Sequence, residues 1–184
     1  SLNPENEQLT LLTNTLATVF ALYFLISSLQ PFSTHFNPAV SFVFCVKGEI
    51  SVKTCTGFVI LQIAGAIAGV MLANYMFGIE PVNFSEKTRS GTNLFVSEIF
   101  ATFGLLLVIL LSTKEKVAAG VAAYIGGAYW FTSSTSFANP AGTIGRAFSD
   151  TFAGISPDDV LAFCCAQVAG AFLAFLLYKK VFSK

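Results

Sequence analysis

The residues with the clearest chemical potential form the same triplet twice, as Asn37-Pro38-Ala39 and Asn139-Pro140-Ala141. Asn caps a helix because its side-chain oxygen accepts a hydrogen bond from an unpaired backbone N–H. Pro fits the first helical turn, where its missing N–H has no partner to lose. The side-chain amide of Asn also carries N–H groups that can donate to a passing hydroxyl-bearing molecule. Each triplet therefore predicts a helix start with a hydrogen-bond donor beside it.

The two triplets begin short apolar segments, roughly 37–46 and 139–148, which cannot cross a bilayer of about 30 Å. We interpret these segments as re-entrant half-helices. If they enter from opposite faces, their N-termini meet near the middle of the membrane, and both positive dipole ends point at one place. Such a place repels cations, whereas water or a polyol can pass.

Composition indicates that lipid is the solvent of this chain. Its 184 residues are 54% hydrophobic and 11% charged, whereas a soluble domain has roughly a quarter charged residues. Five apolar segments have about the length of a membrane span, at approximately 10–28, 54–77, 94–112, 117–134 and 159–178. The formal net charge of zero argues against nucleic acid as a partner. The sequence predicts an all-α membrane protein.

A duplicated unit is predicted within one domain, 1–184. The Asn residues of the triplets are 102 residues apart, and Gln62 and Gln167, which precede similar apolar runs, are 105 apart. We expect a first repeat at 1–91 and a second at 92–184, inverted in the membrane with three spans each. The offset places the first span of the first repeat at about −8 to 10. The expectation is therefore six spans in the full protein and five here, with the first membrane helix absent.

The segments 35–40, 137–141 and Ser97-Glu98 with Thr102-Phe103 resemble the aquaporin, or major intrinsic protein, family along nearly the whole chain. The resemblance implies six spans, two half-helices and a homotetramer with one pore in each subunit. It implies a passive channel in the lipid bilayer that excludes ions and protons and has no enzymatic activity, cofactor or metal. The four cysteines are not in a metal-ligand spacing with His35.

One departure from the family pattern bears on the solute. Most members have Arg directly after the second triplet, where this chain has Gly142. Ungapped counting from the triplets carries the family's other selectivity-filter positions to Ala17, Gly127 and Ser136. These four residues contain no ring and no charge, which favours a wide filter for glycerol-like polyols over strict selectivity for water.

The surroundings of the second triplet, including Thr143 and 149–155, are similar to bacterial aquaglyceroporin-like channels associated with arsenic handling. This similarity adds neutral metalloid acids, such as arsenous acid, to the candidate solutes. It also implies the bacterial inner (plasma) membrane. The loop cations predict a cytoplasmic C-terminus, because one side holds Lys47, Lys53, Lys114, Lys116, Lys179, Lys180 and Lys184.

Three further residues have two interpretations each. Arg146, four residues after Gly142, either supplies the missing positive charge in the outer vestibule or pairs with Asp150. His35 either lines the pore or bonds loop backbone, and both can hold. Glu98, an acid within a span, is interpreted as binding the backbone of the half-helix loop, as in the family, in preference to proton transfer.

Other functions remain open at this stage. A water-selective aquaporin, a secondary transporter and a non-conducting family member are the alternatives. A carrier coupled to an ion needs intramembrane acids, and Glu98 is the only acid within a predicted span. No nucleophile, general base or metal cluster indicates an enzyme.

Overall fold

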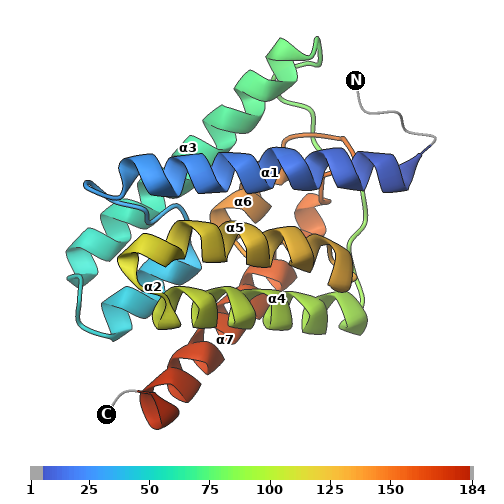
Figure 1. The fold of residues 1–184 in the computed structure, drawn as a ribbon. Helices are drawn as coiled ribbons and strands as arrows, with labels where there is room; N and C mark the ends of the chain where they lie inside the picture. Colours follow the sequence, from blue (N-terminus) through green and yellow to red (C-terminus); the bar gives the residue numbers. More distant parts are fainter. Residues whose placement is uncertain (1–5, 183–184) are drawn as a thin grey trace.

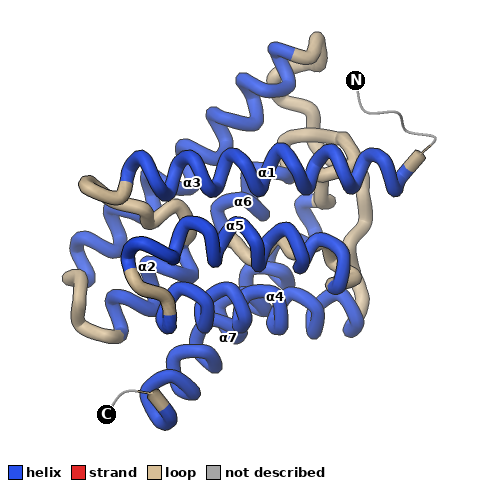
Figure 2. Tube along the Cα trace, in the orientation of Figure 1, coloured by secondary structure: helices blue, strands red, loops and turns tan. Residues whose placement is uncertain are grey.

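The computed structural model describes residues 6–182, and this part of the chain is all-helical (Figure 1, Figure 2). In chain order the helices are α1 (Glu7–Leu29), α2 (Pro38–Val46), α3 (Val52–Met76), α4 (Thr92–Leu111), α5 (Lys114–Phe131), α6 (Pro140–Arg146) and α7 (Pro157–Val181). Within the described residues, pairing of the β type is limited to one isolated bridge between Asn83 and Ser149. Lys184, used above for orientation, lies outside the described residues.

Four of the long helices, α1, α3, α4 and α7, are long and apolar enough to cross a membrane. They correspond to four of the five predicted spans. The remaining prediction, 117–134, coincides with α5, which has only 18 residues and begins with Lys114, Glu115 and Lys116. These three charges at one end distinguish α5 from the other long helices. The prediction of an all-α membrane protein is confirmed.

Helix ends follow the capping preferences of their sequences. The Asn6 side chain accepts from Leu9 N at the start of α1, and the Ser51 side chain accepts from Thr54 N at the start of α3. Pro157 begins α7, where Asp158 and Asp159 lie in the first turn and Lys179 and Lys180 in the last. Acids at the positive end and bases at the negative end of a helix dipole are stabilising.

Small residues set the helix spacing. A Cβ on Gly170 of α7 would collide with the backbone of Ile99 on α4, and a Cβ on Gly145 of α6 would lie 3.0 Å from the Ala66 carbonyl on α3. Close approach of membrane helices requires such positions. Helices α1 and α5 also pack together, as do α4 and α7, and Figure 1 shows α1, α5 and α4 running side by side.

The half-helices α2 and α6 lie among the long helices. Their first residues, Pro38, Ala39, Pro140 and Ala141, are buried. Helix α2 contacts α3 and α7, and α6 contacts α3 and α7 as well. The fold therefore holds the N-termini of the two short helices inside the protein, as the triplets predict.

Candidate functional site: a cavity bordered by two half-helices

Asn37 and Asn139 cap the half-helices with their side-chain oxygens. Asn37 Oδ1 accepts from Ala39 N at 2.9 Å, and Asn139 Oδ1 accepts from Ala141 N at 3.0 Å. Their amide nitrogens bond across the molecule: Asn37 Nδ2 donates to Ala138 O at 2.7 Å, and Asn139 Nδ2 donates to Phe36 O at 3.0 Å. A side-chain amide has two N–H groups, so each Asn keeps one beyond this cross-bond.

A similar set of polar contacts supports each half-helix. Gln62 Nε2 donates to Ser41 Oγ at 2.9 Å and to the His35 carbonyl. Gln167 Nε2 donates to Thr143 Oγ1 at 2.8 Å and to Glu98 Oε2 at 2.6 Å. Ser41 and Thr143 each stand four residues after a capping Asn. The two Gln residues that mark the repeat in the sequence thus donate to hydroxyls at equivalent positions of the two half-helices.

The carboxylate of Glu98 is fully buried and organises the loop before α6. Its oxygens accept from Ser134 Oγ at 2.6 Å, Phe137 N at 2.9 Å and Ala138 N at 2.9 Å, besides Gln167. Hydrogen bonds to a charged acceptor are about twice as strong as neutral ones. These contacts agree with the interpretation of Glu98 as a residue that binds the backbone of the half-helix loop.

The loop held by Glu98 has an unusual backbone. Thr135, Ser136 and Ala138 have φ of 59°, 47° and 47°, in a region that is uncommon for residues other than Gly. Ser136 is 1% exposed, and its Oγ has no hydrogen-bond partner. The Glu98 bonds to Phe137 N and Ala138 N hold this conformation in place.

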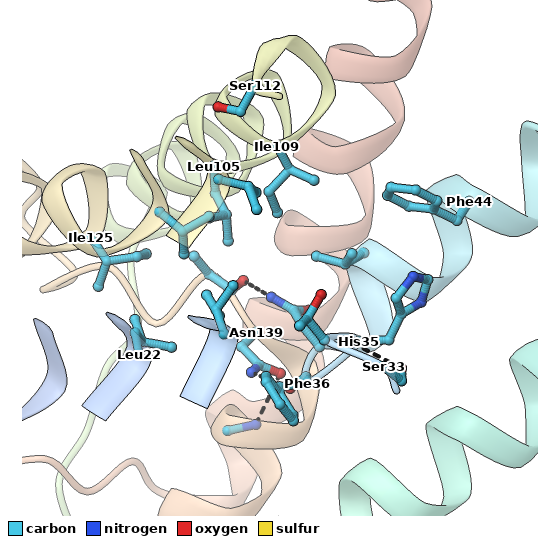
Figure 3. A pocket seen from close by; sticks show the side chains of 18 of the residues that line it. Leu22, Ser33, His35, Phe36, Phe44, Leu105, Ile109, Ser112, Ile125 and Asn139 are labelled. Carbon is cyan, nitrogen blue, oxygen red and sulfur yellow. Dashed lines mark hydrogen bonds between the residues drawn. The ribbon is translucent and has the colours of Figure 1, made fainter. Parts of the chain in front are cut away.

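A cavity of about 680 Å³ runs beside the two Asn residues. Two helices line it with side chains four residues apart, which share one face of a helix. They are Thr18, Leu22 and Ile26 on α1, followed by its C-cap Gln30, and Val117, Val121, Ile125 and Tyr129 on α5. Figure 3 shows Leu22, Ile125, Leu105 and Ile109 around Asn139. The cavity therefore has an apolar wall opposite the polar half-helix loops.

One end of the cavity, which we call the arginine end, is defined by Thr18, Tyr129 and Arg146. Arg146 Nη2 donates to Tyr129 OH at 3.1 Å, and the hydroxyls of Tyr129 and Thr18 are 3.2 Å apart. Asp150 instead accepts from Ser85 Oγ and Glu86 N. Of the two interpretations of Arg146, the structure therefore shows the side chain on the cavity and bonded to Tyr129.

The filter residues expected from the sequence lie partly elsewhere. Ser136 and Gly142 line the cavity, whereas Ala17 and Gly127 are exposed and are not among its lining residues. One residue along a helix is a rotation of about 100°, so Thr18 faces the cavity where its neighbour Ala17 faces away. The arginine end thus contains a ring and a charge, which the four predicted residues lack.

The opposite end, which we call the lysine end, is defined by Gln30, Lys47 and Lys114. His35 lines the cavity toward this end. Its Nδ1 is 3.3 Å from Ser41 Oγ, and its ring packs edge-on against Phe44 at 4.9 Å and Phe58 at 5.4 Å. Figure 3 shows His35 between Phe44 and Phe36. His35 therefore both lines the cavity and has a fixed position.

Three residues of this region escaped the sequence interpretation: Thr18, Tyr129 and Arg89. The first two could have been found from the four-residue periodicity of the cavity-facing stripes on α1 and α5. Arg89 had no such signal, because it stands in a loop with Glu86 and Lys87 and resembles an ordinary surface cation. In the structure it is only 7% exposed.

Taken together, an all-helical membrane fold and two Asn-capped half-helices that meet beside a cavity define a channel architecture. Residues 2–132 match the family described as Major intrinsic protein. The chain belongs to the major intrinsic protein family, whose members are channels and not enzymes.

Individual relatives support this assignment. The chain is similar to aquaglyceroporin AqpS of Rhizobium meliloti (strain 1021), with 45% identity over 178 residues that cover 95% of this chain and 76% of AqpS. Aquaporin-5 of Homo sapiens is 30% identical over 191 residues, covering 92% of this chain and 68% of aquaporin-5. Probable aquaporin TIP2-2 of Oryza sativa subsp. japonica is 27% identical over 154 residues, covering 80% and 62%.

Proposed function

We propose that the protein is a passive channel for small uncharged polar solutes, namely glycerol-like polyols, neutral metalloid acids such as arsenous acid, and water, and that it excludes ions and protons. The observation that carries this proposal is the two-sided cavity. Asn139 and Arg146 offer polar groups on one side, and Leu22 and Ile125 are apolar on the other. A polyol has hydroxyls to match the first side and carbon to match the second. Similarity to an aquaglyceroporin adds support.

Gly142 contributes to the proposed width of the filter. It lines the cavity and has no side chain, and the family's usual Arg would project from this position. Arg146, one turn further along α6, would then supply the positive charge of the outer vestibule. Its position beside Tyr129 at the arginine end supports this role.

A water-selective channel is the second candidate, and one observation favours it. The Thr18–Tyr129–Arg146 chain of hydrogen-bonding groups places a ring and a guanidinium at the arginine end, where both reduce the free cross-section. A narrow filter lets water pass and stops a three-carbon polyol.

Reconstitution separates these candidates. The chain is incorporated into liposomes, and their volume is followed by stopped-flow light scattering, with protein-free vesicles as the baseline. Shrinkage in an impermeant sugar reports water flux, and re-swelling after mixing with glycerol or arsenous acid reports solute entry. Glycerol and arsenous acid entry that rises linearly with concentration supports the proposed function. Water flux alone selects the second candidate, and saturable uptake driven by an ion gradient would indicate a carrier.

We also propose that residues 1–91 and 92–184 are the two inverted repeats of a single domain, that the protein is a homotetramer, and that its C-terminus is cytoplasmic in a bacterial inner membrane. The matched contacts of Gln62 and Gln167 support the repeat. Native mass determination in detergent tests the tetramer. Protease access to a C-terminal tag in sealed vesicles tests the orientation.

A further inference from the structure

Arg89 is a buried cation without a carboxylate at its guanidinium. Its Nε donates to Gly154 O at 2.7 Å, Nη1 to Ser134 O at 3.3 Å and Nη2 to Phe152 O at 3.1 Å. All three acceptors are neutral carbonyls. Among residues 6–182, the ion pair within 4.0 Å joins Lys47 to Glu49 instead. The backbone N of Arg89 donates to Asp159 Oδ2 at 2.6 Å, so a carboxylate lies at its main chain. The guanidinium itself bonds to carbonyl dipoles.

Arg89 remains charged under ordinary conditions. Burial lowers its pKa to about 10, repulsion from Arg146 lowers it in addition, and attraction by Glu98 raises it. A group with this pKa is protonated at neutral pH. The interaction with Arg146 also indicates that the two cations are near enough to act on the same region.

Phe137 connects the two cations to the cavity. The guanidinium carbon of Arg89 lies 4.8 Å from the centroid of the Phe137 ring, and that of Arg146 lies 4.1 Å from it. Phe137 and Arg146 line the cavity, whereas Arg89 does not. The arginine end thus has one positive charge on its surface and a second one behind the ring.

The second charge matters because the first is partly offset. Arg146 lies in the last turn of α6, where the negative end of the helix dipole faces a cation favourably and reduces its outward field. Arg89 instead stands just before Gly91, the N-cap of α4, and the positive end of a helix dipole does not offset a cation. In surroundings of low polarity, an unpaired charge acts over a longer distance than it does in water.

We propose that Arg89 is a specificity-determining residue of the channel, a buried second charge that raises the barrier to cations and protons at the arginine end without touching the solute. This inference rests on the proposed function. The competing explanation is a purely structural tie, because the three carbonyls that Arg89 binds belong to the segments before α6 and before α7. The two explanations differ in what a neutral hydrogen-bond donor at this position would do.

The test compares Arg89→Gln, which keeps an N–H donor but loses the charge, with Arg89→Lys, which keeps the charge. Lys87→Met is the matched control. Lys87 stands in the same loop and also donates to Phe152 O, at 3.0 Å, but its ammonium packs on Phe152 and not on Phe137. Each full-length variant is placed in liposomes, and proton and sodium leak are measured with a pH-sensitive dye and a sodium-sensitive dye under imposed gradients.

Each leak is divided by the glycerol or water flux of the same vesicles, so that differences between variants in the amount of folded protein cancel. We expect the ratio to rise about five- to tenfold in Arg89→Gln, from the loss of one charge in surroundings of low effective dielectric. Arg89→Lys and Lys87→Met should stay within about twofold of the parent.

An unchanged ratio in Arg89→Gln, an equal rise in Arg89→Lys, or a complete loss of flux in both Arg89 variants overturns the inference and favours the structural tie. The flux of the unmodified protein is measured first. Its absence would count against the proposed function and is thereby distinguished from a failure of the Arg89 inference.

Discussion

Asn37 and Asn139 each donate a side-chain amide hydrogen to the loop that precedes the other, at 2.7 Å to Ala138 O and 3.0 Å to Phe36 O. The two half-helices are therefore joined at their N-termini by reciprocal bonds that neither helix could make alone. Each Asn has two separate tasks, which are to cap its own helix and to hold the opposite loop. Substitution can separate them.

Asn37→Ser tests the second task, because Ser caps a helix about as well as Asn but does not reach Ala138 O. We expect a loss of about 1–3 kcal/mol in stability, since a buried carbonyl is left unpaired, and a lower solute flux. Thermal unfolding in detergent and liposome flux measure the two effects. Asn74→Ser is the control, because Asn74 donates to Pro81 O and Phe148 O away from the cavity lining. It should lose stability and keep its flux per folded protein; equal effects on flux would refute a special role for Asn37.

Glu98→Gln should be among the most damaging single changes. The carboxylate accepts from Ser134, Gln167 and two backbone N–H groups, whereas Gln has one oxygen and would turn an NH₂ group toward donors. We expect a loss of at least about 3 kcal/mol, read as a lower unfolding temperature and early aggregation on size exclusion.

Glu115→Gln, at an exposed position at the start of α5, is the control and should leave the unfolding temperature nearly unchanged. If Glu98→Gln instead unfolds at the parent temperature but alters the pH dependence of flux, proton transfer becomes the better interpretation of Glu98.

Gly142→Arg tests the proposed width of the filter by restoring the residue usual in the family. The nearest atoms to a Cβ at this position belong to Asn139 and lie at 3.6 Å or more, which is ordinary van der Waals contact, so the backbone accepts a side chain. We expect glycerol flux to fall by about tenfold or more, an effect equivalent to roughly 1.4 kcal/mol on the barrier, while water flux falls by much less. Gly142→Ala should retain both. Equal loss of water and glycerol flux would indicate a blocked pore and not a narrower filter.

Helix spacing gives a prediction about stability alone. Gly170→Ala would drive a methyl group into the backbone of Ile99 and should cost about 1–3 kcal/mol through overpacking of α4 against α7. Gly69→Ala on α3 meets nothing within 4 Å, so it should be neutral or slightly stabilising, by up to about 1 kcal/mol. Paired thermal unfolding curves in one detergent provide the measurement. Similar losses in both variants would contradict the contact as described.

Much of the fold follows from sequence because membrane helices are long apolar runs with recognisable caps. The Asn-Pro-Ala triplets predict the starts of α2 and α6 at Pro38 and Pro140, as the structure has them. The expectation of five spans was less secure, because the charges at the start of α5 set it apart from the four helices that are apolar enough by composition.

The cavity lining was harder to predict, because it depends on helix rotation. Counting along the chain pointed to Ala17 and Gly127, while Thr18 and Tyr129 face the cavity. Thr18 is one residue from Ala17 and Tyr129 is two residues from Gly127, and each residue along a helix turns the side chain by about 100°. The burial of Arg89 could not be predicted from sequence for another reason. A loop cation is normally solvated, and this one is buried because its own loop packs against the segments before α6 and before α7.

The left-handed residues Thr135, Ser136 and Ala138 also bear on how the protein is made. Glu98, which holds their loop, precedes Ser134 by 36 residues and Gln167 by 69. In a chain synthesised from its N-terminus, α4 and its acid are therefore made before any of these partners. The contacts that brace the second half-helix can be complete only once α7, with Gln167, has been made. The separation in sequence between the Glu98 carboxylate and the groups that it binds thus limits the order in which these contacts can form.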